Sequence, residues 1–189
     1  METFSRPKRT LIVEPKTMNR RKLETLLLTL ESTPALLARA AAERTTCQLQ
    51  WKPEEDAFSL LENVWHLADL EREAYGARIS RLLTEDEPTF SDFDGDRIAR
   101  ERRYNDRDLA AGLTAFWEAR FRNIEALRRA SRSDWKRRAN QDGVGRITLE
   151  DLPRQMARHD ADHTQEIANL LAGLLEGKPC EKSPSSAVA

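Results

Sequence analysis

Two histidines stand four residues apart in the stretch "ARHDADHTQEIANLL", residues 157–171. Residues at i and i+4 share one face of an α-helix, so in a helix His159 and His163 can offer ring nitrogens to one divalent ion. At about 100° per residue, Leu152 and Leu170 fall within about 20° of His159, and His163 falls within about 40°. The pair is therefore predicted to lie on the apolar stripe of its helix and to face other helices.

His66, in "LLENVWHLADLEREAY", is the candidate third ligand, and the polar residues Glu62, Asn63 and Asp69 surround it on an otherwise apolar helix. Two inward imidazoles one turn apart need partners for four ring nitrogens, and a divalent metal satisfies one nitrogen of each at once. His66 alone also fits a boundary histidine with one surface hydrogen bond. Taken with the inward pair, it predicts a three-histidine metal site.

Other metal motifs fit less well. A zincin needs His-Glu-x-x-His, but Asp160 occupies the glutamate position, and a di-iron bundle needs Glu-x-x-His, which precedes none of the three histidines. An EF-hand loop starting at Asp92 in "DFDGD" would have arginine at its sixth and twelfth positions, where glycine and glutamate are required. The two cysteines lie 133 residues apart and have no CxxC spacing, so no thiolate zinc site is indicated.

The charges are balanced overall but unevenly distributed. The formal net charge is −1, which gives no reason to expect nucleic acid or a membrane as partner. Residues 43–96 hold 14 acidic and 5 basic residues, net −9, whereas residues 97–138 hold 13 basic and 6 acidic residues, net +7. We interpret this as ion pairing between neighbouring helices or subunits, with a basic surface for an anion as the alternative.

The chain has no run of 18 apolar residues, and its N-terminal stretch lacks the apolar core of a signal peptide. We therefore expect a cytoplasmic protein with no membrane partner.

Helical periodicity dominates the chain, and no stretch alternates in the manner of a strand, so the fold class is predicted to be all-α. Pro34 predicts a kink or break in the first helix, and the long link between the second and third helices predicts a crossover with a short helix near 97–103. The expected domains are an N-terminal arm (1–16), a four-helix bundle (17–177) and a flexible C-terminal tail (178–189). The four helices are expected over residues 19–43, 54–83, 106–130 and 148–176.

Three stretches, "WKPEEDAFSLLENVWHLADLE", "RERRYNDRDL" and "ITLEDLPRQMARHDADHTQEI", together resemble the DinB/YfiT-like superfamily. The resemblance covers about residues 18–175, and the H-x3-H with an upstream H-x2-[DE] is its most specific part. It implies a four-helix bundle with a crossover, a homodimer, and zinc, nickel or iron held by histidines that map onto His66, His159 and His163. Characterised members include thiol-cofactor-dependent S-transferases and a mycothiol-dependent maleylpyruvate isomerase.

The resemblance thus implies a metal-dependent transferase or hydrolase that acts on a small molecule, in some cases with a low-molecular-weight thiol. Glu166 departs from the family pattern, because a glutamine is common at that position. It falls about 20° from the stripe, so it could be a fourth ligand or a hydrogen-bond acceptor for a ligand. Glu62, Asp69 and Glu166 are candidates to orient the imidazoles or take a proton. For Asp69, capping or ion pairing with Arg72 or Arg103 is an alternative.

Two non-enzymatic functions stay open. The first is a dimeric helical-bundle binding or stress-response protein in which the metal is structural or absent. The second is an anion or nucleic-acid binder, less favoured because basic runs on helices usually form solvated faces. The basic residues that it would use are Arg97, Arg100, Arg102, Arg103, Arg128, Arg129, Lys136, Arg137 and Arg138.

Overall fold

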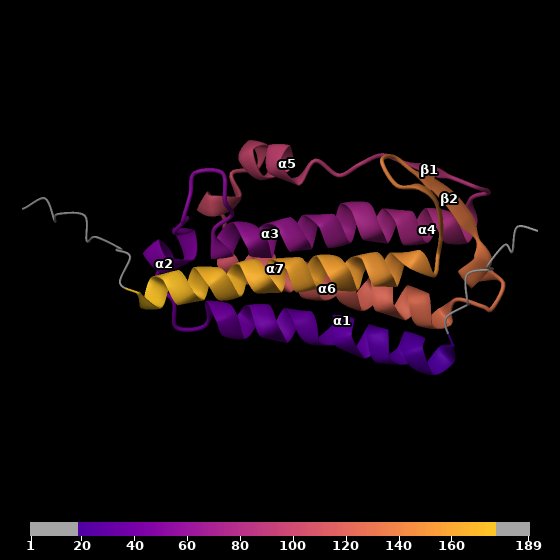
Figure 1. Cartoon of the computed structure of the whole chain (residues 1–189), viewed down its shortest axis with the longest axis horizontal. Coiled ribbons are helices and arrows are strands. Elements are labelled where there is room, and N and C mark those ends of the chain that lie inside the picture. The colour runs from indigo at the N-terminus through magenta and orange to yellow at the C-terminus, as the bar shows by residue number, and fades with distance from the viewer. Residues whose placement is uncertain (1–18, 177–189) are drawn as a thin grey trace, which may run out of the picture.

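Four long helical segments lie side by side along one axis in the computed structural model, which describes residues 19–176 (Figure 1). They agree with the predicted four-helix bundle, whereas the predicted arm (1–16) and tail (178–189) lie outside the described residues. The elements in chain order are α1 (Arg20–Ala41), α2 (Thr46–Gln50), α3 (Leu60–Asp69), a π-helical segment (Leu70–Tyr75), α4 (Gly76–Thr84), β1 (Thr89–Phe90), α5 (Gly95–Glu101), a 3₁₀ turn (Tyr104–Asp106), α6 (Leu109–Arg129), a 3₁₀ turn (Asp134–Lys136), β2 (Arg138–Gln141), β3 (Gly145–Thr148) and α7 (Asp151–Leu175).

The second bundle helix is continuous from α3 through the π-helical segment into α4. It begins at Leu60, later than predicted, because Ser59 and Glu62 form a capping box. The Ser59 hydroxyl accepts a hydrogen bond from the Glu62 amide at 3.0 Å, and the Glu62 carboxylate accepts one from the Ser59 amide at 2.8 Å. These bonds satisfy backbone donors at the helix start, which otherwise lack partners.

The apolar core is divided into two clusters by a buried polar layer. One cluster contains Leu30 and Leu127, and the other contains Leu37 and Phe116. Each of the four bundle helices places a polar residue between members of the two clusters, and the five residues of the polar layer are Thr33, Glu71, Arg120, Asn123 and Asp160. The layer lets charged groups sit inside the bundle because they bond one another.

Arg120 is the centre of this layer. It is 2% exposed, and its guanidinium donates to both oxygens of Asp160 at 2.6 and 2.8 Å and lies 3.0 Å from an oxygen of Glu71. It also donates to the Leu30 carbonyl at 2.9 Å. That carbonyl is four residues before Pro34, which has no N–H to donate to it. Helix α1 therefore runs through Pro34 without ending there, and the predicted break does not occur.

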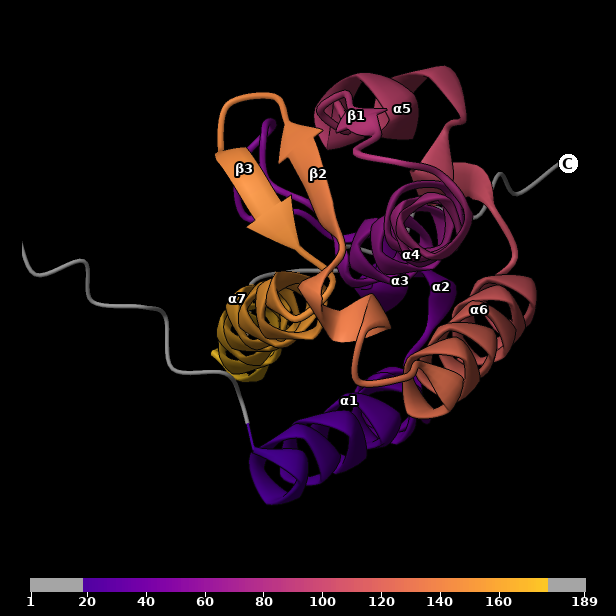
Figure 2. The same cartoon turned by 90° about the vertical axis from the view of Figure 1, so that its right-hand side faces the viewer.

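A three-stranded sheet covers one end of the bundle (Figure 2), and the sequence analysis did not predict it. β2 and β3 form an antiparallel hairpin in which Ala139 pairs with Ile147. β1, from the crossover, pairs in parallel with β2 through Thr89↔Asn140. The sheet therefore fastens the start of the crossover to the segment that leads into α7.

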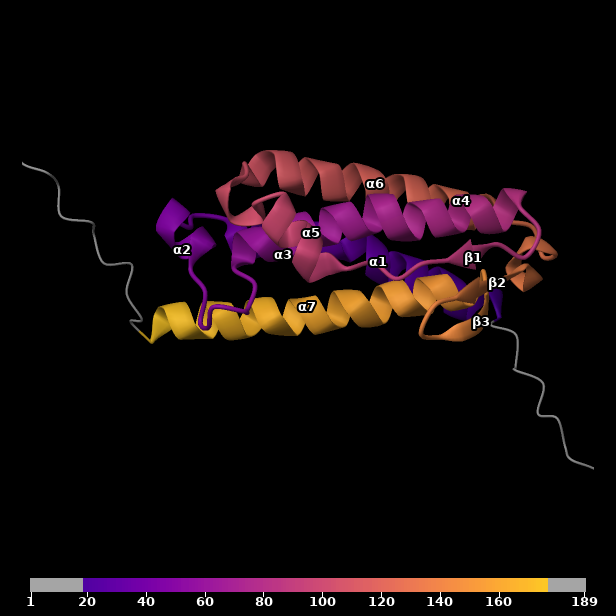
Figure 3. The ribbon, with the colours of Figure 1, turned by 90° about the horizontal axis from the view of Figure 1, so that it is seen from above.

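The rest of the crossover, including α5, runs back along the bundle beside α3 (Figures 1 and 3). The predicted short helix near 97–103 is present as α5 (Gly95–Glu101). Within residues 19–176, no helix has both the length and the apolar character that a bilayer span requires.

Candidate metal centre

The three histidines converge between two neighbouring helices. His66 comes from α3, and His159 and His163 come from consecutive turns of α7. The Nε2 atom of His159 lies 3.4 Å from that of His66 and 3.2 Å from that of His163. His66 and His163 are buried, and the three residues form a group of potential ligand atoms that all lie within 4.8 Å of one another. The structure thus brings together all three residues that the sequence analysis selected as ligands.

This geometry fits a divalent ion. Zinc–nitrogen bonds of about 2.0–2.1 Å at tetrahedral angles place two ligand nitrogens about 3.3–3.4 Å apart, and the observed separations are 3.4 and 3.2 Å. Nitrogen lone pairs that face one another at these distances repel unless a proton or a cation lies between them. The donor set of neutral imidazoles suits zinc, nickel and iron.

The orientation of His163 is fixed from its outer side. Its Nδ1 atom lies 2.6 Å from the Asn63 side-chain oxygen and 3.0 Å from a carboxylate oxygen of Glu166. The Asn63 amide nitrogen donates to the Ser59 carbonyl at 3.0 Å, so its oxygen faces the imidazole. Since both neighbours of Nδ1 are acceptors, Nδ1 carries the proton and Nε2 keeps a lone pair. Asn63, fully buried, received no role in the sequence analysis, although its place one turn before His66 was a usable signal.

The other two histidines are held neutral by their surroundings. Burial, followed by the positive charge that neighbouring histidines would carry, lowers the pKa of His66 to about 3. Burial, followed by the positive charge that His163 would carry if protonated, lowers the pKa of His159 to about 4. In the described part of the chain, the Nδ1 atoms of His66 and His159 have no hydrogen-bond partner. Both imidazoles are therefore unprotonated at neutral pH, the form that binds a metal.

Of the three acidic candidates, the structure brings only Glu166 to the histidines. The Glu62 carboxylate caps its own helix and lies 3.2 Å from the Lys52 ammonium. Asp69 is fully buried and accepts a hydrogen bond from the Tyr104 hydroxyl at 2.6 Å. It also pairs with Arg72 and Arg102, so the expected pairing with Arg72 is present, whereas Arg103 pairs with Asp106. Asp69 therefore fastens the end of the crossover to α3.

The acidic segment 43–96 and the basic segment 97–138 form some of their ion pairs with each other. Arg102 pairs with Asp69 and Glu73, and Arg120 pairs with Glu71. Two of the other basic residues considered for anion binding are also occupied, since Arg128 pairs with Glu31 and Arg137 donates to the Leu82 carbonyl. This pattern agrees with the interpretation that neighbouring helices exchange ion pairs.

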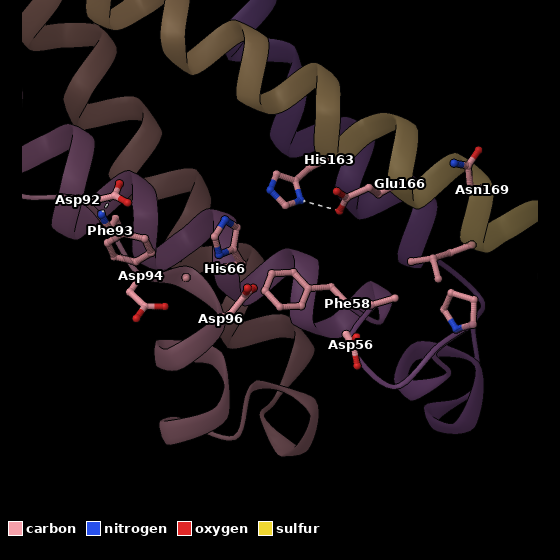
Figure 4. Close-up of a pocket in the computed structure, with 14 residues that line it drawn as sticks. Asp56, Phe58, His66, Asp92, Phe93, Asp94, Asp96, His163, Glu166 and Asn169 are labelled. Carbon is pink, nitrogen blue, oxygen red and sulfur yellow. Dashed lines mark hydrogen bonds and ion pairs between the residues drawn. The ribbon is translucent and has the colours of Figure 1, made fainter. Parts of the chain in front are cut away.

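A cavity of about 900 Å³ opens onto His66 and His163 (Figure 4). The rings of Phe58 and Phe93 flank His66, with centroids 5.2 and 6.0 Å from its own. The lining residues are Pro53, Asp56, Ala57, Phe58, His66, Asp92, Phe93, Asp94, Gly95, Asp96, His163, Glu166, Asn169 and Leu170. A small molecule that enters this cavity can therefore reach the histidines.

Gly95 makes room for His66. A Cβ atom on Gly95 would lie 2.4 Å from Cε1 of His66 and 2.7 Å from its Nδ1, closer than atoms can approach. We expect Gly95→Ala to displace the imidazole and weaken Zn²⁺ binding about 10–100-fold, the usual effect of disturbing a ligand's support. Competition with a chromophoric chelator measures the affinity. Gly173→Ala, which crowds Trp51 instead of a histidine, is the matched control, and equal affinities of both variants would contradict the expectation.

Comparison with known proteins identifies the family and the fold of this chain. A sequence model of the DinB superfamily matches residues 29–167. Among solved structures, YfiT from Bacillus subtilis, described as "a probable metal-dependent hydrolase with an unusual four-helix bundle topology", superimposes with a TM-score of 0.77. The match has 23% sequence identity and covers 85% of this chain and 93% of YfiT, so it establishes the fold. No curated protein sequence matches significantly.

Proposed function

Since the chain belongs to the DinB superfamily, we propose that it is a metal-dependent enzyme whose divalent ion is bound by His66, His159 and His163. The observation that carries the proposal is the convergence of three Nε2 atoms at 3.2 and 3.4 Å, in a cluster of which His66 and His163 line a cavity large enough for a small molecule. Three protein ligands leave at least one position of the metal open, as in catalytic sites.

The metal would supply Lewis acidity, which lowers the pKa of a water molecule or thiol that reaches its open position. The chain's own residues prepare the site for this chemistry. Asn63 holds His163 in the tautomer that presents Nε2, and the rings of Phe58 and Phe93 restrict water around His66.

Glu166 is the residue best placed to move a proton. The hydrogen bond from His163 is the main cause that keeps its carboxyl pKa below the usual range, so it is ionised at neutral pH. Its side chain is half-exposed and lines the cavity, where it can accept a proton from a nucleophile. We therefore assign the proton-accepting role to Glu166 before Glu62 or Asp69, whose carboxylates are engaged elsewhere.

The reaction class proposed is hydrolysis or the transfer of a thiol to a small molecule, since a Lewis-acidic metal held by the three histidines would activate water or a thiol as nucleophile. Zinc, nickel and iron are the candidate ions, and a low-molecular-weight thiol is the candidate cosubstrate. A screen of ester, amide and thiol-transfer substrates, run with and without a chelator, distinguishes the two reactions. An activity that survives complete chelation would contradict a metal-dependent mechanism.

Elemental analysis of untreated protein is the direct test of the metal site. We expect about one equivalent of a transition metal in the natural chain and less than about a tenth in His159→Ala, because two imidazoles hold a metal much less tightly than three. Added metal should raise the melting temperature of the natural chain and leave that of the variant unchanged.

Asn169→Ala is the matched control, because Asn169 lines the same cavity on the same helix without contacting the histidines. It should keep the metal and the stabilisation. A natural chain without metal, whose melting temperature equals that of His159→Ala with and without added Zn²⁺, would overturn the proposal.

A non-catalytic dimeric binding protein is the second candidate. It is supported by two exposed aromatic residues of α6, Trp117 and Phe121, which are 56% and 54% exposed and stack with centroids 5.8 Å apart. Large apolar side chains at a surface are a common feature of subunit interfaces. The homodimer, the small-molecule substrate and the cytoplasmic location stay predictions.

A further inference from the structure

The wall of the cavity that opens onto His66 and His163 carries negative charge. Its lining includes five carboxylates and neither lysine nor arginine, and the carboxylates belong to Asp56, Asp92, Asp94, Asp96 and Glu166. In Figure 4 they lie on both sides of His66, with Asp92, Asp94 and Asp96 from the crossover and Asp56 from the segment before α3. A cavity with walls of one sign concentrates ligands of the opposite sign.

Two of these five carboxylates are left without a partner. In residues 19–176, Asp56 and Asp96 have neither a hydrogen bond nor an ion pair. Asp94 caps α5 and lies 3.3 Å from the Arg97 guanidinium, and Asp92 accepts a bond from the next backbone amide. At least two carboxylates therefore remain available to a ligand.

The basic residues nearest in sequence are committed to other partners. Arg97 donates to Glu101 at 2.8 and 2.9 Å, and Arg102 pairs with Asp69 and Glu73. Lys52, near the opposite wall, pairs with Glu62. Among the described residues, neither a lysine nor an arginine lines the cavity, and of these three cations only Arg97 pairs with a carboxylate of its wall, that of Asp94.

Two further features of the cavity bear on the ligand. His66 is 7% exposed and lines the cavity, and its Nδ1, which lies against Gly95, has no partner among the described residues. Because Nδ1 carries the proton when Nε2 faces a metal, its partner would be an acceptor in the reacting part of a ligand and not a cation. The rings of Phe58 and Phe93 form apolar walls beside the carboxylates. Aromatic faces combined with carboxylates recognise organic cations, through the negative face of the ring and through ion pairing.

We propose that the substrate carries a positively charged nitrogen group, an ammonium or guanidinium, which Asp56 and Asp96 bind while the reacting group lies at the histidines. This inference rests on the proposed function for the role of the cavity as a substrate site. Away from the metal, Asp56 and Asp96 would repel an anionic group of a substrate.

The test compares two probes of the same shape on the full chain: choline, which is cationic, and 3,3-dimethylbutan-1-ol, in which carbon replaces nitrogen. Neither quaternary centre can bind a metal, and the hydroxyl is common to both, so any difference reports charge recognition. We expect choline to bind at least about tenfold more tightly at low ionic strength, measured by titration calorimetry or ligand-observed NMR, and to lose this advantage as salt is added.

Asp56→Asn combined with Asp96→Asn should abolish the preference for choline and leave the alcohol unaffected. Glu118→Gln combined with Glu125→Gln removes the same charge from α6, outside the cavity, and should keep the preference. Equal binding of the two probes by the natural chain, or a preference that survives in the Asp56 and Asp96 variant, would overturn the inference.

The same titrations on His159→Ala separate this inference from the proposed function. A metal-free variant that still prefers choline supports the cation site whatever the metal content of the natural chain. A natural chain without metal would then count only against the proposed function, and a natural chain without the preference for choline only against the cation site.

Discussion

Arg120→Met is expected to lower the free energy of unfolding by about 3–5 kcal/mol, the usual cost of removing one partner from a buried ion pair. Arg120 is 2% exposed, and its guanidinium pairs with Asp160 and Glu71 and donates a hydrogen bond to the Leu30 carbonyl. Without it, two buried carboxylates would face each other with no cation. Burial already raises the pKa of Glu71, and Arg120 opposes that rise.

Urea unfolding of the natural chain and of Arg120→Met at pH 7 measures the difference between their free energies of unfolding. Arg122→Met is the matched control, since Arg122 lies on the same helix, is well exposed, and pairs with Glu118 at 3.6 Å. It should cost less than about 0.5 kcal/mol. The combination Arg120→Met, Glu71→Gln and Asp160→Asn removes all three charges and should recover part of the loss. A cost for Arg120→Met as small as that of Arg122→Met would show that the polar layer does not depend on its cation.

The metal-free protein should lose stability steeply as the pH falls from about 6.5 towards 4. In the unfolded chain, His66 and His159 take up protons near pH 6.5. In the folded chain burial lowers their pKa values to about 3 and about 4, so they stay neutral through this window. The unfolded state then binds more protons, and stability falls by up to about 1.4 kcal/mol per pH unit for each histidine.

Unfolding of chelator-treated protein in urea at a series of pH values measures this slope. A variant with His66→Gln and His159→Gln has no titrating imidazole at these positions and should show a flatter dependence from pH 6.5 to 4. If the variant and the natural chain lose stability in parallel, the buried histidines are not the cause. Equal slopes would therefore contradict the neutral state assigned to the ligands.

The candidate ligands His159 and His163 could be assigned to one buried face from the sequence, because helical periodicity is a local property. His159 and His163 lie on one face of α7 whatever surrounds the helix, and the apolar residues on that face indicate that it is buried. Membership of the DinB superfamily and the four-helix bundle are confirmed. The bundle was predicted from the periodic pattern, whereas the family was identified from the resemblance of three stretches to its members.

The partners of the acidic candidates could not be predicted in this way. Periodicity shows on which face of a helix a residue lies, but not how far its side chain is from residues of the neighbouring helix. Glu62 and Asp69 share the polar strip of His66, yet one caps α3 and the other bonds Tyr104 from the crossover. Of the kink or break predicted at Pro34, the break does not occur, for a similar reason: the carbonyl that proline leaves free is satisfied by Arg120, 90 residues away. The short strands were missed because residues 89–90, 138–141 and 145–148 are too brief to show alternation.

The crossover is attached to the rest of the protein at two points, where β1 pairs with β2 and where Tyr104 bonds Asp69. Between these points, residues 91–103 provide one wall of the cavity, whereas the histidines and Asn63 belong to α3 and α7. Gly95 and Phe93 of that span lie against His66, but its other side chains can change without displacing a histidine. Under the proposed function, relatives could therefore take up new substrates through substitutions in this single segment, while the three histidines stay in place.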